Sequence, residues 1–315
     1  MIFVIGTLVA LLMPAVQSAR ETARRASCVN RMRQLGLAML QHVEARGAFP
    51  AGALSRESPN APSTPWTFYR WSALAAVSPY LENQAAIDAL DLDQPLYQSN
   101  FAVTADNQEG VRRLVPDFLC PSDQEQRVSE QFGPTNFAVC AGTGDADPEQ
   151  IFDNGSPIDT DGLFAVNSAT RPGQILGGMS KTALASESLL GVPRDEAPHD
   201  PQTEYKFVLV PITDAKCAGP AQWNLTDPRG FSWANGEFRC ALYNHRLTPN
   251  SSDPDCMAAL VGGPLEILFT PFGWRGPRSW HPGGVNVLQA DGSIGFTEDA
   301  VDQQVWRRLS TIDAD

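Results

Sequence analysis

A histidine and an aspartate near the C-terminus are the residues of this chain best suited to acid–base chemistry. Nine residues separate His281 from Asp291-Gly292 in the stretch SWHPGGVNVLQADG. Histidine transfers protons near neutral pH, and a carboxylate can orient it. However, alternating apolar residues from Val285 to Gln289 predict a strand between the two, which would hold them roughly 30 Å apart. We therefore expect His281 to bond to nearby backbone and Asp291 to stabilise its own turn.

Six cysteines offer thiol, disulfide or metal chemistry. They are Cys28, Cys120, Cys140, Cys217, Cys240 and Cys256. None forms a C-x-x-C pair, which argues against a zinc or redox motif. An even number suits disulfides in an exported domain, whereas the alternative is that some are small buried hydrophobic residues.

An acidic stretch from Asp145 to Gly162, DADPEQIFDNGSPIDTDG, could bind calcium. Its ending Asp159-Thr160-Asp161-Gly162 resembles part of a calcium loop, but the full ligand order and the later glutamate are missing. A solvated loop is the preferred interpretation, with calcium as the alternative.

Other chemical motifs are absent from the sequence. There is no G-x-S-x-G, H-E-x-x-H, P-loop or dinucleotide fingerprint, and the four histidines are scattered. We expect no enzymatic activity, no cofactor and no metal.

A long N-terminal helix must position everything that follows. Residues from Ile2 to Met13 are almost all apolar, and an apolar stripe then recurs at three- and four-residue spacing. This stripe consists of Cys28, Met32, Leu35, Met39 and Val43. Gly47 and Pro50 end the pattern, so one helix of roughly 65 Å is predicted from Ile2 to about Ala45.

The first turns of this helix are apolar on every side and therefore need lipid or other copies of themselves. The apolar run to Val16 is shorter than the ~20 residues that span a bilayer. Pro14 should remove a hydrogen bond and bend the axis.

Charge is divided unevenly between the helix and the rest of the chain. Residues 1–46 hold six arginines against Glu21 and Glu44, a net charge of +4. Because the whole chain has a net charge of −13, the remaining residues carry −17. An acidic exterior repels phosphate, which argues against nucleic acid as a partner.

The rest of the chain is predicted to form an α+β domain rich in short antiparallel strands. The whole chain has 25 glycines and 25 prolines, and turns containing these residues separate the apolar runs. A short helix is expected at Ser72–Val77, and strands at Thr135–Cys140 and Tyr205–Ile212. The segment Val111–Leu119 is expected to contain the end of a strand, which a turn follows at Cys120.

A hairpin and a helix are predicted to close the chain. Ala290-Asp291-Gly292 would form the hairpin turn, with Gly292 at positive φ. Thr297 would cap a helix from Glu298 to about Leu309. The residues expected to face the domain are Val301, Val305, Trp306 and Leu309.

Several stretches resemble a large planctomycete-type family of prepilin-like proteins of unknown function. That family has an apolar run ending Leu-Pro-Ala-Val-Gln, which is followed by Arg-Glu-x-Ala-Arg-Arg. This chain matches the first motif at Leu12–Gln17, with Met13 in place of Leu, and the second at Arg20–Arg25. Further matches lie at Cys120-Pro121-Ser122-Asp123 and at the C-terminal His-x9-Asp-Gly signature. The family's Gly-Phe-Thr-Leu-x-Glu processing motif is missing, either because the start is placed late or because this copy is never processed.

The resemblance implies a pilin-like protein with a membrane or filament helix at residues 1–46 and an extracytoplasmic β-rich domain at residues 47–315. Its partners would be the bilayer and other pilin-like subunits of a type IV pilus or type II secretion-like system. Arg20, Arg24 and Arg25 alone would favour the cytoplasm, but the resemblance implies inner-membrane anchoring with the domain periplasmic or at the cell surface. The matching stretches also suggest a Cys28–Cys120 disulfide, and we further expect Cys240–Cys256.

The family has also been labelled solute-binding, so the alternative is an envelope-anchored protein that binds carbohydrate or peptide. Tryptophans would stack on sugars if two or more were exposed around a concave site, whereas buried ones would favour a scaffold. Those considered are Trp66, Trp71, Trp223, Trp233 and Trp274. A third possibility is a remnant that does not assemble.

Overall fold

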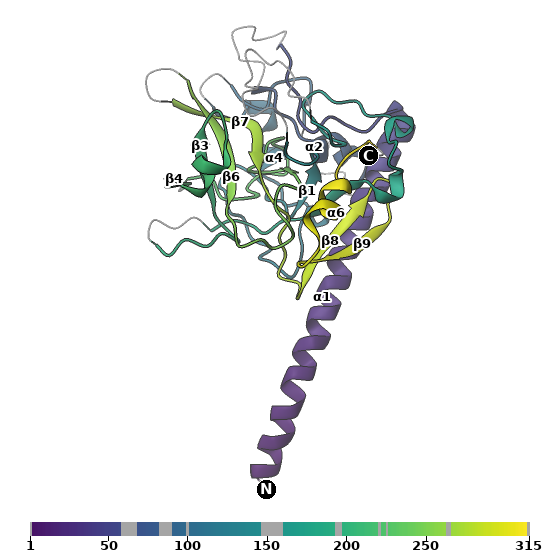
Figure 1. Cartoon of the computed structure of the whole chain (residues 1–315), viewed down its shortest axis with the longest axis vertical. Coiled ribbons are helices and arrows are strands. Elements are labelled where there is room, and N and C mark those ends of the chain that lie inside the picture. The colour runs from purple at the N-terminus through teal and green to yellow at the C-terminus, as the bar shows by residue number, and fades with distance from the viewer. Residues whose placement is uncertain are drawn as a thin grey trace.

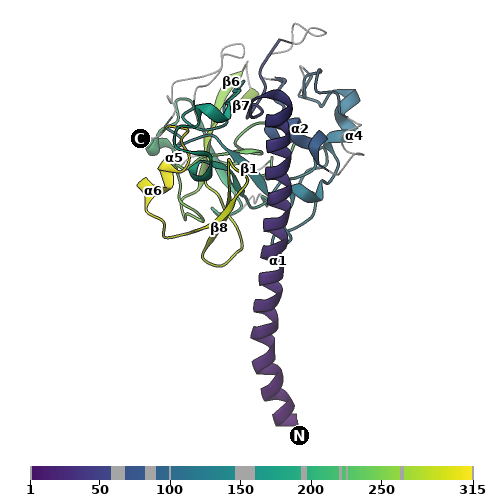
Figure 2. The same cartoon turned by 90° about the vertical axis from the view of Figure 1, so that its right-hand side faces the viewer.

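A single long helix runs along one side of a β-rich domain and projects well beyond it (Figures 1 and 2). The computed structural model describes residues 2–57, 68–81, 90–98, 101–145, 160–192, 197–219, 222–224, 226–262 and 266–313. Helix α1 spans Ile2–Arg46, as the apolar pattern predicts, and continues through Pro14. Within the described residues, no helix is long and apolar enough to meet the criterion for a membrane span.

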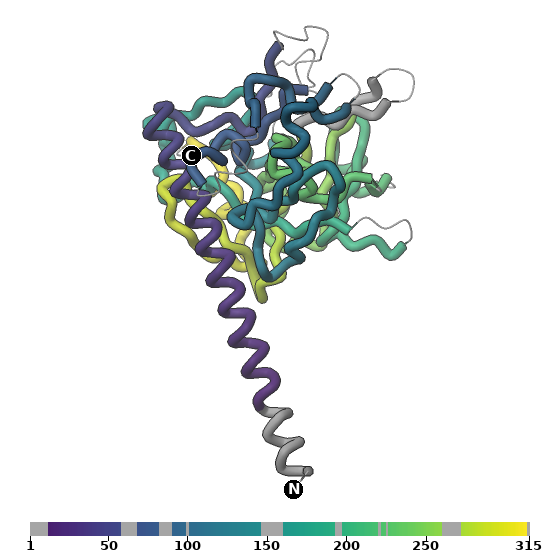
Figure 3. Tube along the Cα trace, turned by 180° about the vertical axis from the view of Figure 1, so that it is seen from behind, coloured from purple at the N-terminus to yellow at the C-terminus, as the bar shows by residue number. Residues whose placement is uncertain are grey.

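The second half of α1 is packed on the domain through the predicted stripe. Cys28, Met32, Leu35 and Met39 are all fully buried, and Val43 packs against the same core. At Gly36 the helix approaches the side chain of Leu288 so closely that an added Cβ would lie 2.9 Å from it. This apolar face holds the domain on one side of the helix only, and Figure 3 shows the tube of α1 leaving the domain toward the N-terminus.

Two sheets form the domain. The first has the order β5-β1-β2-β8-β9 and the second the order β4-β3-β6-β7. The strands of the first sheet are β1 (Phe137–Cys140), β2 (Ala183–Glu187), β5 (Leu242–Tyr243), β8 (Gly284–Gln289) and β9 (Ile294–Glu298). Those of the second are β3 (Tyr205–Leu209), β4 (Gln222–Trp223), β6 (Asp255–Gly262) and β7 (Glu266–Trp274).

Most strand pairs are antiparallel, and the parallel pairs among the described residues are β1 with β5 and β3 with β6. The predicted hairpin is present as β8–β9, and Gly292 in its turn has φ +86°. The fold is thus the expected α+β arrangement of a long N-terminal helix on a mostly antiparallel domain.

Short helices connect these strands. They are α2 (Ala73–Val77), η2 (Ser78–Tyr80), η3 (Ala105–Asn107), α4 (Gln108–Val111), η4 (Pro116–Phe118), η5 (Pro172–Gln174), η6 (Met179–Lys181), α5 (Asp214–Ala218) and α6 (Gln303–Arg308). The expected strand at Val111–Leu119 is wrong, because α4 ends and η4 forms there. Pro116 begins η4, where its missing N–H costs no helical hydrogen bond.

The final helix starts later than predicted. Thr297 pairs with Val285 in the β8–β9 ladder, so it belongs to a strand and cannot cap a helix. Instead, the side chain of Asp302 accepts hydrogen bonds from the backbone at the start of α6. Trp306 is fully buried as expected, whereas Val305 is half-exposed and does not face the domain.

Candidate functional site

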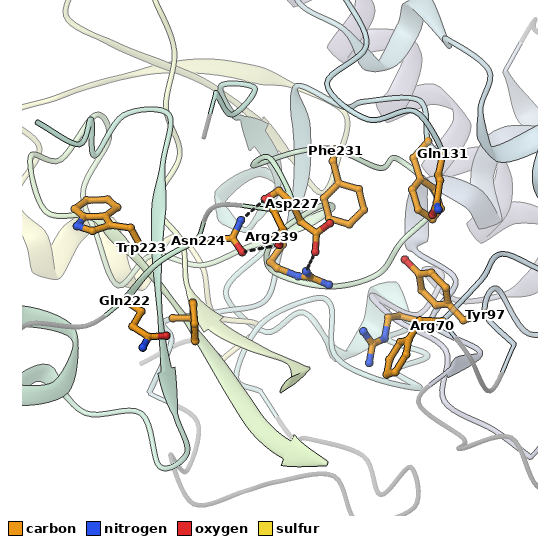
Figure 4. A pocket seen from close by; sticks show the side chains of 13 residues that line it. Arg70, Tyr97, Gln131, Gln222, Trp223, Asn224, Asp227, Phe231 and Arg239 are labelled. Carbon is orange, nitrogen blue, oxygen red and sulfur yellow. Dashed lines mark hydrogen bonds and ion pairs between the residues drawn. The ribbon is translucent and has the colours of Figure 1, made fainter. Parts of the chain in front are cut away.

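A pocket of about 590 Å³ opens between the second sheet and loops from the first half of the chain (Figure 4). This volume lies within the range of about 300–1,000 Å³ typical of small-molecule sites. Its lining combines aromatic, amide and charged side chains. They are Arg70, Tyr97, Phe101, Gln131, Phe132, Phe207, Gln222, Trp223, Asn224, Thr226, Asp227, Phe231 and Arg239.

A chain of ion pairs forms the floor of this pocket, with Arg70, Arg239 and Asp227 in its lining and Glu237 buried behind them. The buried carboxylate of Glu237 lies 3.0 Å from Arg70 Nη1 and 2.5 Å from Arg239 Nη2. Arg239 Nη1 in turn lies 2.5 Å from Asp227 Oδ2. Two guanidinium groups therefore face two carboxylates, and the floor is electrically balanced and fixed in position.

Tyr97 brings a hydroxyl group to the buried end of the pocket. Its oxygen accepts a hydrogen bond from Asn235 Nδ2 at 2.8 Å. Burial, reinforced by the charge of Glu237, raises the pKa of Tyr97 well above its usual value, so the hydroxyl stays protonated. Among the described residues this O–H has no acceptor, and it points toward Phe231 and Arg239 (Figure 4). It is available as a donor to an occupant of the pocket.

Tryptophans contribute less to this pocket than the sugar-binding alternative requires. Trp71, Trp233 and Trp274 are buried, and Trp66 lies outside the described residues. Of the four tryptophans in this set that the structure describes, only Trp223 lines the pocket, and the ring of His199 stacks on it with centroids 4.5 Å apart. The other aromatic side chains of the lining are Tyr97 and four phenylalanines, of which Phe132 and Phe231 are only 3% exposed.

A second cluster of polar residues lies where α1 meets the domain, around His281. The imidazole is fully buried, with Nδ1 2.8 Å from Glu21 Oε1 and Nε2 3.0 Å from Glu187 Oε1. Glu187 also accepts bonds from the backbone and side chain of Asn286. The expectation that His281 bonds to nearby backbone is therefore wrong, because helix α1 and strand β2 each bring a carboxylate to the ring.

Only an imidazolium can donate from both ring nitrogens at once, so the geometry favours charged His281. Burial opposes the charge, but the hydrogen bonds and charges of Glu187 and Glu21 outweigh it and raise the pKa of His281. Burial likewise opposes ionisation of Glu21, yet hydrogen bonds from His281, Arg24 and Ser122 lower the pKa of that carboxyl. The charged trio fastens the helix to the domain.

This trio makes stability depend on pH. Because the folded-state pKa of His281 is raised, its contribution is complete below its ordinary value of about 6.5 and is lost as pH rises through the folded value. The contribution of Glu21 is lost only in acid, below its ordinary value. We expect the stability difference between the wild type and His281→Gln to shrink from pH 6 to pH 9. Urea unfolding at fixed salt measures it, and a difference that grows toward pH 9 would contradict the assignment.

The family signature residues fall into two groups. The Cys120–Asp123 turn lies beside His281: Ser122 Oγ donates to Glu21, and Asp123 accepts bonds from Asn136 and the backbone of Leu190. Pro121 also lies in this turn, and its side chain has no polar group with which to form a hydrogen bond.

The other group lies at the far end of strand β8. Asp291 accepts bonds from the backbone and hydroxyl of Ser293, so it stabilises its turn as predicted. Gly292 packs near Leu40 of α1. His281 and Asp291 thus act at opposite ends of the strand.

Two disulfides are present. Cys28 of α1 is bonded to Cys120, the pair suggested by the family stretches. The expected Cys240–Cys256 pair is wrong, because Cys256 is bonded to Cys217 and Cys240 is a buried free thiol. Strands β3 and β6 pair in parallel, and α5 follows β3 directly, so Cys217 is brought next to Cys256.

Metal binding has little support among the described residues. Ligand atoms of Cys28, Cys120, Glu187 and His281 lie within 4.8 Å of one another, but the two sulfurs are bonded together and offer no thiolate. Most of the acidic stretch considered for calcium, residues 146–159, lies outside the described residues. The carboxylate of Asp161 at its end accepts bonds from the backbone and hydroxyl of Thr143.

Comparison with known families decides the assignment. A profile of the family described as "Protein of unknown function (DUF1559)", with the label SBP_bac_10, matches residues 17–304. The chain belongs to the DUF1559 family. No curated protein and no solved structure matches it. The match confirms the resemblance to a family of unknown function that also carries a solute-binding label, and it spans both the contact of α1 with the domain and the pocket.

Sequence reasoning missed two groups of site residues in this DUF1559 protein. Glu21 lies in the Arg20–Arg25 stretch that resembles the family, but nothing in the sequence indicated that Glu21 and Glu187 would both contact one histidine. The pocket residues come from separate segments and carry no motif. Of these residues, only Trp223 had been considered as a candidate, because a tryptophan can stack on a sugar.

Proposed function

We propose that this protein is a pilin-like, helix-anchored envelope protein that serves as a structural or assembly subunit of a type IV pilus or type II secretion-like system. The observation that carries the proposal is the projection of α1 away from the domain (Figures 1 and 2). On this part of the helix Leu12 is 60%, Met13 59% and Val16 46% exposed. Such side chains are stabilised by lipid or by apolar faces of other copies.

The attachment of the other half of α1 supports a mechanical role. The Cys28–Cys120 bond, the Glu21–His281 pair and the stacking of the Arg25 guanidinium 3.6 Å from the Phe296 ring centre all join helix to domain. A force on the projecting turns would pass into the sheet through these contacts. Under this proposal the helix lies in the inner membrane and then among other helices, the domain faces the periplasm or cell surface, and the role is non-catalytic.

Fractionation combined with crosslinking tests the proposal. A photoreactive amino acid at Leu12 in the native host should link copies of the protein in membranes and in sheared surface material, whereas one at Gln34 in the packed half serves as a control. Release of the protein from membranes by a salt wash would overturn anchoring. Retention in membranes without self-crosslinks would overturn assembly.

A second candidate function is solute binding, and the pocket of Figure 4 is the observation that favours it. Its floor is rigid, its walls are aromatic, and a buried hydroxyl group points into it, as in a preformed small-molecule site. An anchored domain could hold a ligand at the envelope. Calorimetric binding of any small molecule that is abolished by filling the pocket would support this function, and binding unaffected by filling would count against it.

A further inference from the structure

We infer that the pocket binds a neutral carbohydrate of one or two sugar rings, an assignment that rests on the second candidate function. The inference comes from three properties of the lining: balanced charge, hydroxyl-matching polar groups and aromatic faces. The polar groups and the rings belong to the lining, and so do three of the four charged groups, whereas the fourth, Glu237, lies directly behind it.

Charge balance selects a neutral occupant. The carboxylates of Glu237 and Asp227 already face the guanidinium groups of Arg70 and Arg239, and Glu237 is completely buried. A charged ligand would lose hydration without meeting an excess of opposite charge, which costs free energy. A neutral ligand avoids that cost.

Polar groups at both ends of the pocket suit hydroxyl groups. The O–H of Tyr97 is a buried donor; in Figure 4 the exposed amide of Gln131 lies on the same side of the pocket, and the exposed amide of Gln222 lies on the opposite side. An amide side chain both donates and accepts hydrogen bonds. Sugar hydroxyl groups also do both, so a sugar ring can satisfy the two ends together.

Aromatic rings provide flat apolar walls for the C–H face of a sugar. Phe231 and Phe101 line the cavity, and the Arg239 guanidinium lies 5.4 Å from the Phe231 ring centre, which helps to hold that ring in place. The volume of about 590 Å³ accommodates one or two rings with water.

A peptide fits less well. Peptides commonly add a strand to an exposed sheet edge. The edge strand at this pocket is β4, which is only two residues long and offers few backbone groups for pairing. The sugar is therefore the favoured occupant, and the peptide is an outcome of the test.

Ligand-observed NMR and calorimetry on the full chain in phosphocholine micelles test the inference. The probes are glucose, galactose, N-acetylglucosamine, maltose and cellobiose, with glucuronate and tetra-alanine as charged and peptide comparisons. We expect at least one neutral sugar to bind and both comparisons to fail.

The double variant Gln131→Ala/Gln222→Ala should weaken sugar binding about tenfold or more through the loss of two or more hydrogen bonds. Because both glutamines are exposed, folding should be unchanged. The matched control Gln126→Ala/Gln304→Ala removes two exposed amides outside the pocket and should bind like the wild type.

The outcomes separate this inference from the function on which it rests. Binding of glucuronate or tetra-alanine but of no neutral sugar would overturn the carbohydrate assignment and keep solute binding. Failure of every probe would overturn the carbohydrate assignment and count against solute binding. Sugar binding that both double variants retain equally would overturn the placement of the site.

Discussion

The Asp255→Asn variant is expected to lose about 3–5 kcal/mol of unfolding free energy, the cost of breaking a buried ion pair by removing one partner. Asp255 begins strand β6 and is fully buried. Its carboxylate lies 2.7 Å from Arg229 Nη1 and 3.1 Å from Arg278 Nη2, and both arginines are also inaccessible to solvent. Asparagine would leave two buried cations without a facing charge.

A third buried arginine increases the cost. Burial lowers the pKa of Arg275 to about 10 and that of Arg229 below its usual range, and the charge of Asp255 opposes both shifts. Arg275 also donates to the backbone carbonyls of Phe238, Cys240 and Leu242. That loop carries the floor of the pocket, so the variant should lose ligand binding together with stability.

Denaturant unfolding with the disulfides intact measures this effect. The matched control is Asp253→Asn, since Asp253 is exposed and contributes a backbone carbonyl, not its carboxylate, to Arg278. The control should stay within about 0.5 kcal/mol of the wild type. A loss of less than about 1 kcal/mol for Asp255→Asn would show that the buried arginines do not depend on this carboxylate.

Removing the junction disulfide should have the second large effect. Cys28 and Cys120 are 92 residues apart, and a crosslink over a loop of that length constrains the unfolded chain by up to about 4–5 kcal/mol in the chain-entropy account. We expect Cys28→Ala/Cys120→Ala to lose most of this stabilisation. Amide hydrogen exchange in the packed half of α1 should also accelerate, because the helix can then separate from the domain.

The control for this variant is Cys140→Ala. Cys140 is equally buried but forms no disulfide, so its replacement removes one buried sulfur and should cost only about 1–2 kcal/mol. If the double variant were no less stable than this control, and exchange in α1 were unchanged, the disulfide would not be the main attachment of the helix.

Local sequence patterns predicted the elements that are specified by residues close to one another in the sequence. The stripe from Cys28 to Val43 specified the buried face of α1, because helical periodicity is a local property. The β8–β9 hairpin followed from alternation and from Gly292, whose positive φ a glycine adopts without strain. The start of α6 was misplaced because Thr297 and Asp302 are both good caps, and strand pairing decided between them.

Long-range contacts could not be predicted in this way. Glu21 and His281 are 260 residues apart, and no local rule states that they meet. Cys217 reaches Cys256 only because β3 and β6 pair in parallel. The pocket likewise depends on loops whose positions follow from the packed core, so composition indicated aromatic residues but not which of them would be exposed.

Lipid binding by the projecting turns of α1 is the most direct test of the central claim. Flotation of the full chain with phosphatidylethanolamine–phosphatidylglycerol vesicles should carry the wild type to the top of a density gradient. The variant Leu12→Glu/Val16→Glu, altered only where the helix is exposed, should stay at the bottom, whereas Gln34→Glu/Leu37→Glu in the packed half should float. A wild type that fails to float, or a Leu12→Glu/Val16→Glu variant that floats equally well, would contradict the proposed anchoring.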